Sequence, residues 1–423
     1  MTLYSLKDFT MVSNSFYVDT LGCPKNEVDT RMIKKVLLLS GNSVTNDAKK
    51  ADIVIVNTCG FLQEALEEAF ERIAYWKRKK KKIIVTGCAV ERLGVKAFEK
   101  KGVVAYYLDS LLGIDGYEQV KKQRALPHCD NQIYDEGRLF HYLKVQEGCK
   151  RRCSYCVISR IRGPLRSRST KDILKEIEIA KEKGALEIVL IAQDLTLYGV
   201  DTGDSLVNLL RGLPGGLYYR LMYLHPHGIT EELVKTLAEK DVFLPYIHIP
   251  IQHVSNRVLK DMGRAGGERA VKRCLELVRK YLPHYFIRVD VMVGFPTEED
   301  RDFENLLNFL EIFRPERIAV FKYSHEPGVP SFNLADLPED VKSERYQICF
   351  DLAQDIMHKA QKSLLGKEII AFKDTPFTWS QYDAVSIDFE VEIKNVRDRK
   401  WSGKVKITEV LDTLDVVGLP VLP

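Results

Sequence analysis

The chain has 423 residues, of which 45% are hydrophobic and 29% are charged, and its formal net charge is +4. This length predicts two or three domains that are each large enough to bury a core. The net charge is too small to indicate a polyanionic partner by itself.

No apolar run approaches the roughly 18 residues of a membrane helix. The first residues lack the charged-then-apolar plan of a signal peptide. We therefore expect a cytoplasmic protein without a membrane partner. Its nine cysteines favour metal or redox chemistry over a disulfide scaffold.

Three strands and two helices alternate after an extension that ends near Asn14. The strands are expected at SFYVDTLG, ADIVIVNT and KIIVTG, and the helices at about Asn26–Leu39 and Leu62–Lys80. Continuous apolar strands joined by helices predict a parallel sheet that is covered on both faces.

One cysteine follows each of these strands, namely Cys23, Cys59 and Cys88. Open parallel sheets bind ligands at the carboxyl ends of their strands. We therefore expect the three cysteines to converge on a metal cluster, although they lie far apart in the chain. The alternative is that each is an ordinary buried cysteine.

Two further segments of this part of the chain have weaker patterns. The basic run Lys77–Lys82 is compatible with an RNA-binding patch, but a solvated helix end is the favoured interpretation because cations suit the helix dipole there. Residues Leu112–Glu136 indicate a helix and a polar linker, in which His128 and Cys129 have no partner pattern.

A second group of cysteines has the spacing C-x3-C-x2-C and consists of Cys149, Cys153 and Cys156. It follows an alternating strand that ends at Gly148. Three thiolates can hold three irons of a cubic 4Fe–4S cluster and leave the fourth iron open. A structural zinc site needs four ligands, usually from two C-x2-C pairs, and the sequence has no second pair.

The basic residues Lys150, Arg151 and Arg152 flank this group, and we expect them to lower the pKa of its thiols.

Strands and helices alternate after this motif. Strands are expected at Glu187–Ala192, Tyr218–Leu224, Tyr246–Pro250, Phe286–Val293 and Arg317–Tyr323, and helices at Lys171–Lys183, Thr230–Lys240, Glu268–Tyr281 and Glu299–Phe313. With the strand before Cys149 this makes six β/α units, which predict a partial TIM-like (β/α)6 barrel. Active sites of such barrels lie at the carboxyl ends of the strands.

Polar residues follow several of these strands and are expected to line that rim: Gln193, Asp194, His225, His227, Gln252, His253 and Gly294. The histidines are equally compatible with hydrogen-bonded groups at the edge of the core. Gly294 precedes Phe295 and Pro296, which indicates a close backbone approach by a ligand or by a helix.

The chain ends in a long helix, about Glu339–Leu365, and a segment with the pattern of a small β-barrel, Gly366–Pro423. This segment has 8 Lys and Arg against 10 Asp and Glu, or −2. We expect it to bind protein rather than bare RNA, with Asp383, Asp388, Glu390 and Glu392 attracting a basic partner. The alternative is that these carboxylates only keep the domain soluble.

The C-x3-C-x2-C motif after a strand resembles the signature of radical S-adenosylmethionine (SAM) enzymes. The chain from Phe16 to its end is similar to the methylthiotransferases of that superfamily. TLGCPKNEVDT, AQDLTLYG, YLHPHGIT, PIQHVSNRVLKDMGR and VGFPTEEDRDF resemble the branch that modifies a ribosomal protein. Val254 and Thr297 stand where that family usually has glycine.

The resemblance implies a mixed α/β architecture of three domains. These are an N-terminal cluster domain (14–125), a radical SAM domain (135–365) and a C-terminal all-β TRAM domain (366–423).

It also implies two 4Fe–4S clusters. Cys23, Cys59 and Cys88 would hold the auxiliary cluster, and Cys149, Cys153 and Cys156 the cluster that binds SAM. The candidate SAM pocket consists of Tyr155, Gln193, Asp194, His225, Gln252, His253 and Gly294.

The implied reaction adds a methylthio group to the β-carbon of an aspartate in the twelfth protein of the small ribosomal subunit. It consumes two SAM molecules per turnover and requires an external electron donor and a sulfur donor. Two alternatives stay open, a tRNA methylthiotransferase acting on an isopentenyladenosine-type base and a non-catalytic iron–sulfur protein that binds RNA. Direct binding of nucleic acid is likewise left open.

Overall fold

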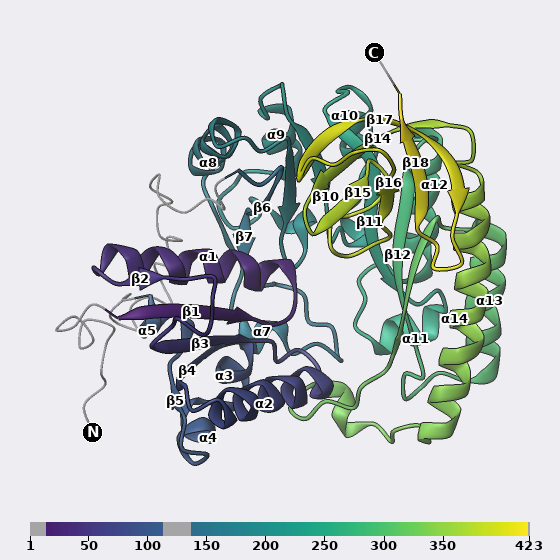
Figure 1. Cartoon of the computed structure of the whole chain (residues 1–423). Helices are drawn as coiled ribbons and strands as arrows, with labels where there is room; N and C mark the ends of the chain where they lie inside the picture. The colour runs from purple at the N-terminus through teal and green to yellow at the C-terminus, as the bar shows by residue number, and fades with distance from the viewer. Residues whose placement is uncertain (1–13, 113–136, 422–423) are drawn as a thin grey trace.

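Three sheets of five, six and five strands follow one another along the chain (Figure 1). The computed structural model describes residues 14–112 and 137–421. Most of the helix and linker expected at Leu112–Glu136, with His128 and Cys129, lies outside the described residues. None of the described helices is long and apolar enough to cross a membrane.

The first sheet is parallel and has the order β2-β1-β3-β4-β5. Its strands are β1 (Ser15–Thr20), β2 (Ser43–Val44), β3 (Ile53–Thr58), β4 (Lys82–Gly87) and β5 (Val104–Ala105). Its helices are α1 (Pro24–Leu39), α2 (Gln63–Arg78), α3 (Cys88–Leu93), α4 (Val95–Glu99) and α5 (Leu108–Leu111). The sequence pattern predicted the three long strands but missed β2 and β5, which are only two residues long.

The two long helices cover opposite faces of this sheet, as the continuous apolar strands predict. Ile33 and Leu37 of α1 pack on one face, and Leu66 and Ile73 of α2 pack on the other. The basic run after α2 is exposed except at Lys81, whose ammonium binds backbone carbonyls. Exposure is expected for a solvated helix end and for an RNA-binding patch alike, so the favoured interpretation stays a prediction.

The second sheet is a six-stranded parallel sheet with the order β13-β12-β11-β10-β9-β6. Its strands are β6 (Phe140–Lys144), β9 (Glu187–Ile191), β10 (Tyr218–Leu221), β11 (Phe243–Gln252), β12 (Phe286–Val293) and β13 (Arg317–Lys322). β6 and β13 are the two ends of this sheet and are not paired with each other among the described residues, which confirms the expected partial (β/α)6 barrel.

Helices pack on the outer face of this barrel around a large apolar core. They are α8 (Thr170–Glu182), α9 (Leu206–Arg211), α10 (Glu231–Ala238), α11 (Asn256–Asp261), α12 (Gly267–Tyr281), α13 (Asp300–Phe313) and α14 (Glu339–Lys362). The short helix α7 (Ile158–Ile161) instead packs against α3 of the first domain. The cysteine loop itself is closed by the short antiparallel pair β7 (Gln146–Glu147) and β8 (Arg166–Ser167).

The third sheet has the order β15-β14-β17-β18-β16. Its strands are β14 (Glu368–Asp374), β15 (Phe377–Ser380), β16 (Val391–Ile393), β17 (Lys400–Val410) and β18 (Val416–Pro420). Neighbouring strands are antiparallel except β16 and β18. The end strands β15 and β16 contact each other, so the sheet forms a nearly closed barrel, as expected.

This small barrel packs against the concave face of the six-stranded sheet. Phe372 and Trp379 lie in one apolar cluster with Phe140, Val189 and Tyr246, which point into the concave face. The C-terminal barrel therefore fills one end of the open (β/α)6 barrel.

A fully buried ion pair fastens this contact. Arg220 donates from Nε to Glu187 Oε1 at 2.6 Å, and both side chains have zero exposure. Trp379 donates to the other oxygen of Glu187 at 2.6 Å, and Arg220 also donates to the Ser380 carbonyl. Each charged group thus binds the C-terminal segment as well as its partner.

The acidic residues of this segment correct one expectation. Asp383 is buried and accepts from Arg317 at 2.6 and 2.8 Å, and Asp388 is paired with Arg288. These two carboxylates therefore anchor the domain and do not attract a basic partner. The exposed Glu390 and Glu392 leave that part of the prediction untested.

We predict that Arg220→Met lowers the free energy of unfolding by about 3–5 kcal/mol, because it leaves the Glu187 carboxylate buried without its cation. Urea unfolding measures the change. Arg211→Met is the matched control, since Arg211 pairs with Glu232 on the surface with 48% and 60% of the side chains exposed. The control is expected to change stability by less than about 1 kcal/mol, and equal losses in the two variants would contradict the prediction.

Candidate functional site

Cys23, Cys59 and Cys88 follow β1, β3 and β4, which are neighbours in the first sheet. The loops that carry them touch. A Cβ atom at Gly22 would lie 2.8 Å from Cys59 Cβ and 3.1 Å from its Sγ, and the φ angle of Gly22 is +91°, so only glycine fits. The structure therefore brings the three cysteines to one edge of the sheet.

Asn26 holds this edge together. Its side-chain amide donates to the carbonyls of Leu21 (2.7 Å) and Thr58 (3.1 Å), which precede the first two cysteines. Burial raises the pKa of the Cys88 thiol to about 12, although the nearby Arg162 acts in the opposite direction. Burial likewise raises the pKa of Cys59.

Cys149, Cys153 and Cys156 lie in the loop after β7, at the carboxyl edge of the second sheet. Gly148 makes the turn possible, since its φ is +75° and a Cβ there would lie 2.0 Å from the Pro164 carbonyl oxygen. The amide of Cys156 donates to the carbonyl of Cys153 at 3.2 Å, which closes the loop.

The expected lowering of the thiol pKa by the basic flank is wrong. Burial raises the pKa of Cys149 to about 11 and that of Cys156 to about 12. Arg151 directs its Nε to Asp194 Oδ2 at 2.8 Å, while Lys150 and Arg152 are exposed. Desolvation of the thiols therefore outweighs the nearby positive charges.

Both groups of three carry free thiols that are not joined in disulfides. Among residues 14–112 and 137–421, no three His, Cys, Asp or Glu side chains are arranged to hold a single metal ion. The assignment of these cysteines to iron clusters stays a prediction that rests on their placement.

Four of the expected pocket residues surround the second cysteine group. Gln193 donates to Glu147 Oε1 at 2.7 Å, and Asp194 pairs with Arg151 as described. The Tyr155 hydroxyl lies 3.5 Å from Arg264 Nη1.

His225 completes this part of the rim. It accepts from the His227 amide through Nδ1 at 3.2 Å, and its buried Nε2 has no hydrogen-bond partner among the described residues. Burial, assisted by Arg264 and Arg151, lowers the pKa of His225 to about 2. The imidazole is therefore neutral and has one ring nitrogen left for a ligand.

The other three expected pocket residues have different surroundings. His253 Nε2 lies 3.5 Å from Glu298 Oε2, and the Gly294 amide donates to both oxygens of Glu298. Glu298 in turn binds Arg345 of α14 at 2.8 Å. These groups form a buried polar cluster beneath α14.

Gly294 has a φ of +75°, and a Cβ there would lie 2.6 Å from the Lys342 side chain of α14. The close approach expected at Gly294 is thus made by a helix. Gln252 ends β11 with a left-handed φ of +68°, which changes the direction of the chain before His253.

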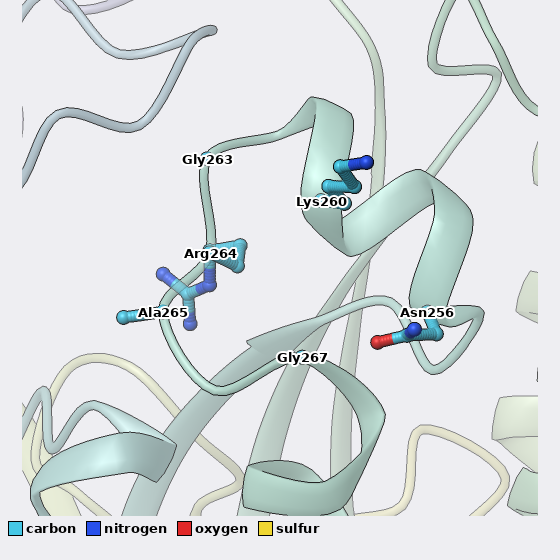
Figure 2. A pocket seen from close by; sticks show the side chains of 6 residues that line it. All are labelled: Asn256, Lys260, Gly263, Arg264, Ala265 and Gly267. Carbon is cyan, nitrogen blue, oxygen red and sulfur yellow. The ribbon is translucent and has the colours of Figure 1, made fainter.

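A cavity of about 290 Å³ lies between α11 and α12, next to the second cysteine loop, and Figure 2 shows the residues that line it. It is lined by Asn256, Lys260, Gly263, Arg264, Ala265 and Gly267. Gly263 lies against the loop, because a Cβ there would be 2.8 Å from the Arg152 carbonyl oxygen. The sequence pattern did not single out Lys260 and Arg264, the two basic residues of this cavity, because Lys and Arg are common near a helix end.

Sequence reasoning also missed a buried ionic network between the two cysteine groups. Lys144 and Arg162 bind the two oxygens of Asp29 at 2.6 Å each, and Lys144 also pairs with Glu147. Arg162 Nη2 lies 3.1 Å from Cys88 Sγ. The signal in the sequence was the presence of the charged residues Lys144 and Glu147 in a strand region whose alternate residues Leu143 and Val145 are apolar.

The charges of this network stabilise one another. Burial alone would raise the pKa of Glu147, but Lys144 and Arg162 hold it at about 2. Because the folded-state pKa is below the ordinary value of 4.5, this carboxylate stabilises the fold above about pH 4.5 and loses that contribution as the pH falls toward 2.

We predict that Lys144→Met lowers the free energy of unfolding by about 3–5 kcal/mol at neutral pH, because Asp29 and Glu147 lose a buried partner. The difference from wild type should shrink as the pH falls below about 4.5, because the stabilising contribution of the Glu147 carboxylate is lost there. Urea unfolding at several pH values measures both effects. Lys272→Met, which removes an exposed pair with Glu268, is the control; a pH-independent loss in Lys144→Met would contradict the explanation.

Comparison with known proteins gives concordant matches. The model of the Radical SAM superfamily matches residues 143–310, and the model described as Uncharacterized protein family UPF0004 matches residues 15–109. These two spans contain the two cysteine groups.

Curated relatives match nearly the full length. The ribosomal protein uS12 methylthiotransferase RimO of Thermosipho africanus is 34% identical over 424 residues, covering 96% of this chain and 99% of that protein. The protein of the same name from Aquifex aeolicus is 37% identical over 420 residues, covering 95% and 96%.

A solved structure shares the fold. The radical S-adenosylmethionine methyltransferase TsrM from Kitasatospora setae, with its tryptophan substrate and a SAM analogue bound, has a TM-score of 0.53 at 14% identity. The match covers 75% of each chain.

Proposed function

Because the chain belongs to the family of ribosomal protein uS12 methylthiotransferases, we propose that it adds a methylthio group to the β-carbon of an aspartate in uS12. The observation that carries this proposal is the similarity over nearly the full length, including both cysteine groups. The proposed activity is a radical SAM reaction that uses two 4Fe–4S clusters and two SAM molecules per turnover.

The cysteines suit these clusters. Cys23, Cys59 and Cys88 would hold the auxiliary cluster, and Cys149, Cys153 and Cys156 the cluster that binds SAM. Three thiols per cluster leave one iron open in each. In support, each group lies on the carboxyl edge of its sheet and has free thiols.

An unactivated C–H bond cannot be opened by acid–base groups alone, so the reduced cluster with bound SAM supplies the radical chemistry. The protein's own residues bind and orient the reacting groups, and they exclude water from the site. The network of Asp29, Lys144, Glu147 and Arg162 fixes the first cysteine group relative to the barrel rim. Such fixed placement is what a reaction between two bound groups requires.

The candidate pocket residues form two groups that differ in their distance along the rim from the second cysteine loop. Tyr155, Gln193, Asp194 and His225 adjoin the second cysteine loop, and the open Nε2 of His225 favours a role in binding SAM. Gly294 is occupied by Glu298 and α14, and the His253 Nε2 faces Glu298 at 3.5 Å, although it has no hydrogen-bond partner among the described residues. For these two we propose a supporting role beneath the rim.

The three parts of the chain are proposed to act as separate domains, 14–125, 135–365 and 366–423. The sulfur donor and the electron donor are proposed to be external. A cytoplasmic location is proposed because uS12 is a ribosomal protein.

The decisive experiment is mass spectrometry of uS12 and of tRNA from a strain that lacks this protein. The proposal expects uS12 to lose its methylthio group while tRNA modification stays unchanged. Loss of a methylthio group from tRNA instead would overturn the proposal and favour the tRNA enzyme. No change in either, together with no reductive cleavage of SAM by the purified protein, would favour the non-catalytic iron–sulfur protein.

We predict that the two clusters are separable. Cys153→Ala should keep about half of the iron and lose cleavage of SAM, because each cluster depends on its own three thiolates. Cys59→Ala should lose the other half of the iron and still cleave SAM. Iron analysis and a SAM cleavage assay on anaerobically prepared protein measure this, with Cys274→Ala, a buried cysteine outside both groups, as the control. If either variant loses all iron, the two-site assignment is wrong.

A further inference from the structure

Lys25 places a positive charge at the boundary between the two cysteine groups. It is the second residue of α1, two positions after Cys23, and its Nζ lies 3.4 Å from the centre of the Tyr223 ring. Tyr223 follows β10 and belongs to the carboxyl edge of the second sheet. The side chain therefore reaches from the ligand edge of the first sheet to that of the second.

Among residues 14–112 and 137–421, no acidic side chain forms an ion pair with Lys25; Cys23 and Glu147 act on it electrostatically, and its Nζ lies over the Tyr223 ring. The carboxylates that face this region are already paired, Asp29 with Lys144 and Arg162, and Glu147 with Lys144. Because this network has two negative and two positive groups, the charge of Lys25 is additional to it.

The location is unfavourable for a cation that has no anionic partner. The first turn of a helix carries the positive end of the helix dipole, and α1 has 16 residues. The same dipole attracts an anion. A partly buried ammonium group at this end of the helix therefore favours a negatively charged ligand that arrives from outside the chain.

We propose that Lys25 binds the side-chain carboxylate of the substrate aspartate. This inference rests on the proposed function and extends it to the recognition of the reacting residue. The carboxylate of aspartate is bonded directly to the β-carbon, so holding it at Lys25 places that carbon between the two cysteine groups. Asparagine at the same place would lose the charge-assisted hydrogen bond, which makes Lys25 a specificity-determining residue.

Two other roles would also place a lysine here, and both make different predictions. A purely structural cation–π contact with Tyr223 would affect stability, and would change activity on aspartate and asparagine substrates equally. A lysine that only balances the thiolates of the first cysteine group would affect iron content. The substrate preference and the iron content therefore separate the three roles.

The test uses the full-length protein, prepared anaerobically with both clusters, as wild type, Lys25→Met, Lys25→Arg and Lys34→Met. Methionine keeps the unbranched side chain without its charge and is one atom shorter than lysine. Lys34 lies on the same helix, is also partly exposed and is outside the site, so it is the matched control. Each protein acts on purified uS12 that carries either aspartate or asparagine at the position that the wild type modifies, and mass spectrometry measures the product.

We expect Lys25→Met to keep its iron and to lose about a hundredfold in kcat/KM with the aspartate substrate, as for the loss of a hydrogen bond to a charged group. The preference for aspartate over asparagine should fall with it. Lys25→Arg should recover part of the activity, and Lys34→Met should match the wild type.

Three results would overturn the assignment of Lys25: unchanged activity in Lys25→Met, an equal loss with both substrates, or a loss of iron that accounts for the loss of activity. If the wild type itself fails to modify uS12, the proposed function is wrong and the assignment falls with it. The reaction of the wild type with uS12 thus distinguishes a failure of the proposed function from a failure of the Lys25 assignment alone.

Discussion

Four charged side chains buried between the first and second sheets determine how the two cysteine groups face each other. Asp29 comes from α1, Lys144 and Glu147 from the region of β6 and β7, and Arg162 from the loop after α7. A buried charge is costly unless it is paired, so each of these residues fixes the position of the others. Arg162 extends the same constraint to Asn26 and Cys88. The relative placement of the two edges is therefore set by ion pairs whose geometry allows little freedom.

The open barrel explains why the C-terminal sheet is present in the same chain. Six strands leave a concave face that eight strands would have closed, and an exposed apolar surface of that size would be unfavourable. The C-terminal barrel covers one end of this face through Trp379 and the buried pair of Arg220 and Glu187. The other end, where the strands finish, stays available for the cysteine loop and for the edge of the first sheet.

Much of the fold was predictable because the strands are long, apolar and regularly separated by amphipathic helices. The convergence of Cys23, Cys59 and Cys88 followed from the rule that parallel strands end at one edge. The contact of His253 with Glu298 was not predictable, since the two residues are far apart in the chain, as are Glu298 and the α14 residue Arg345. The raised thiol pKa values escaped prediction for a related reason, because burial depends on the whole fold whereas the basic flank is visible in the sequence.

The C-terminal segment shows why the net charge of a segment is a poor guide to its partner. Its charge of −2 counts Asp383 and Asp388, yet both carboxylates are neutralised by Arg317 and Arg288 of the central barrel. Only the charges that face solvent act on an approaching molecule, because a paired and buried charge has its field largely cancelled by its partner. Asp374 is likewise buried and pairs with Arg138. Without these three carboxylates the segment has 8 positive and 7 negative residues, or +1. The net charge of the segment therefore favours neither a basic protein nor RNA as its partner, and the prediction for the exposed Glu390 and Glu392 stays a prediction.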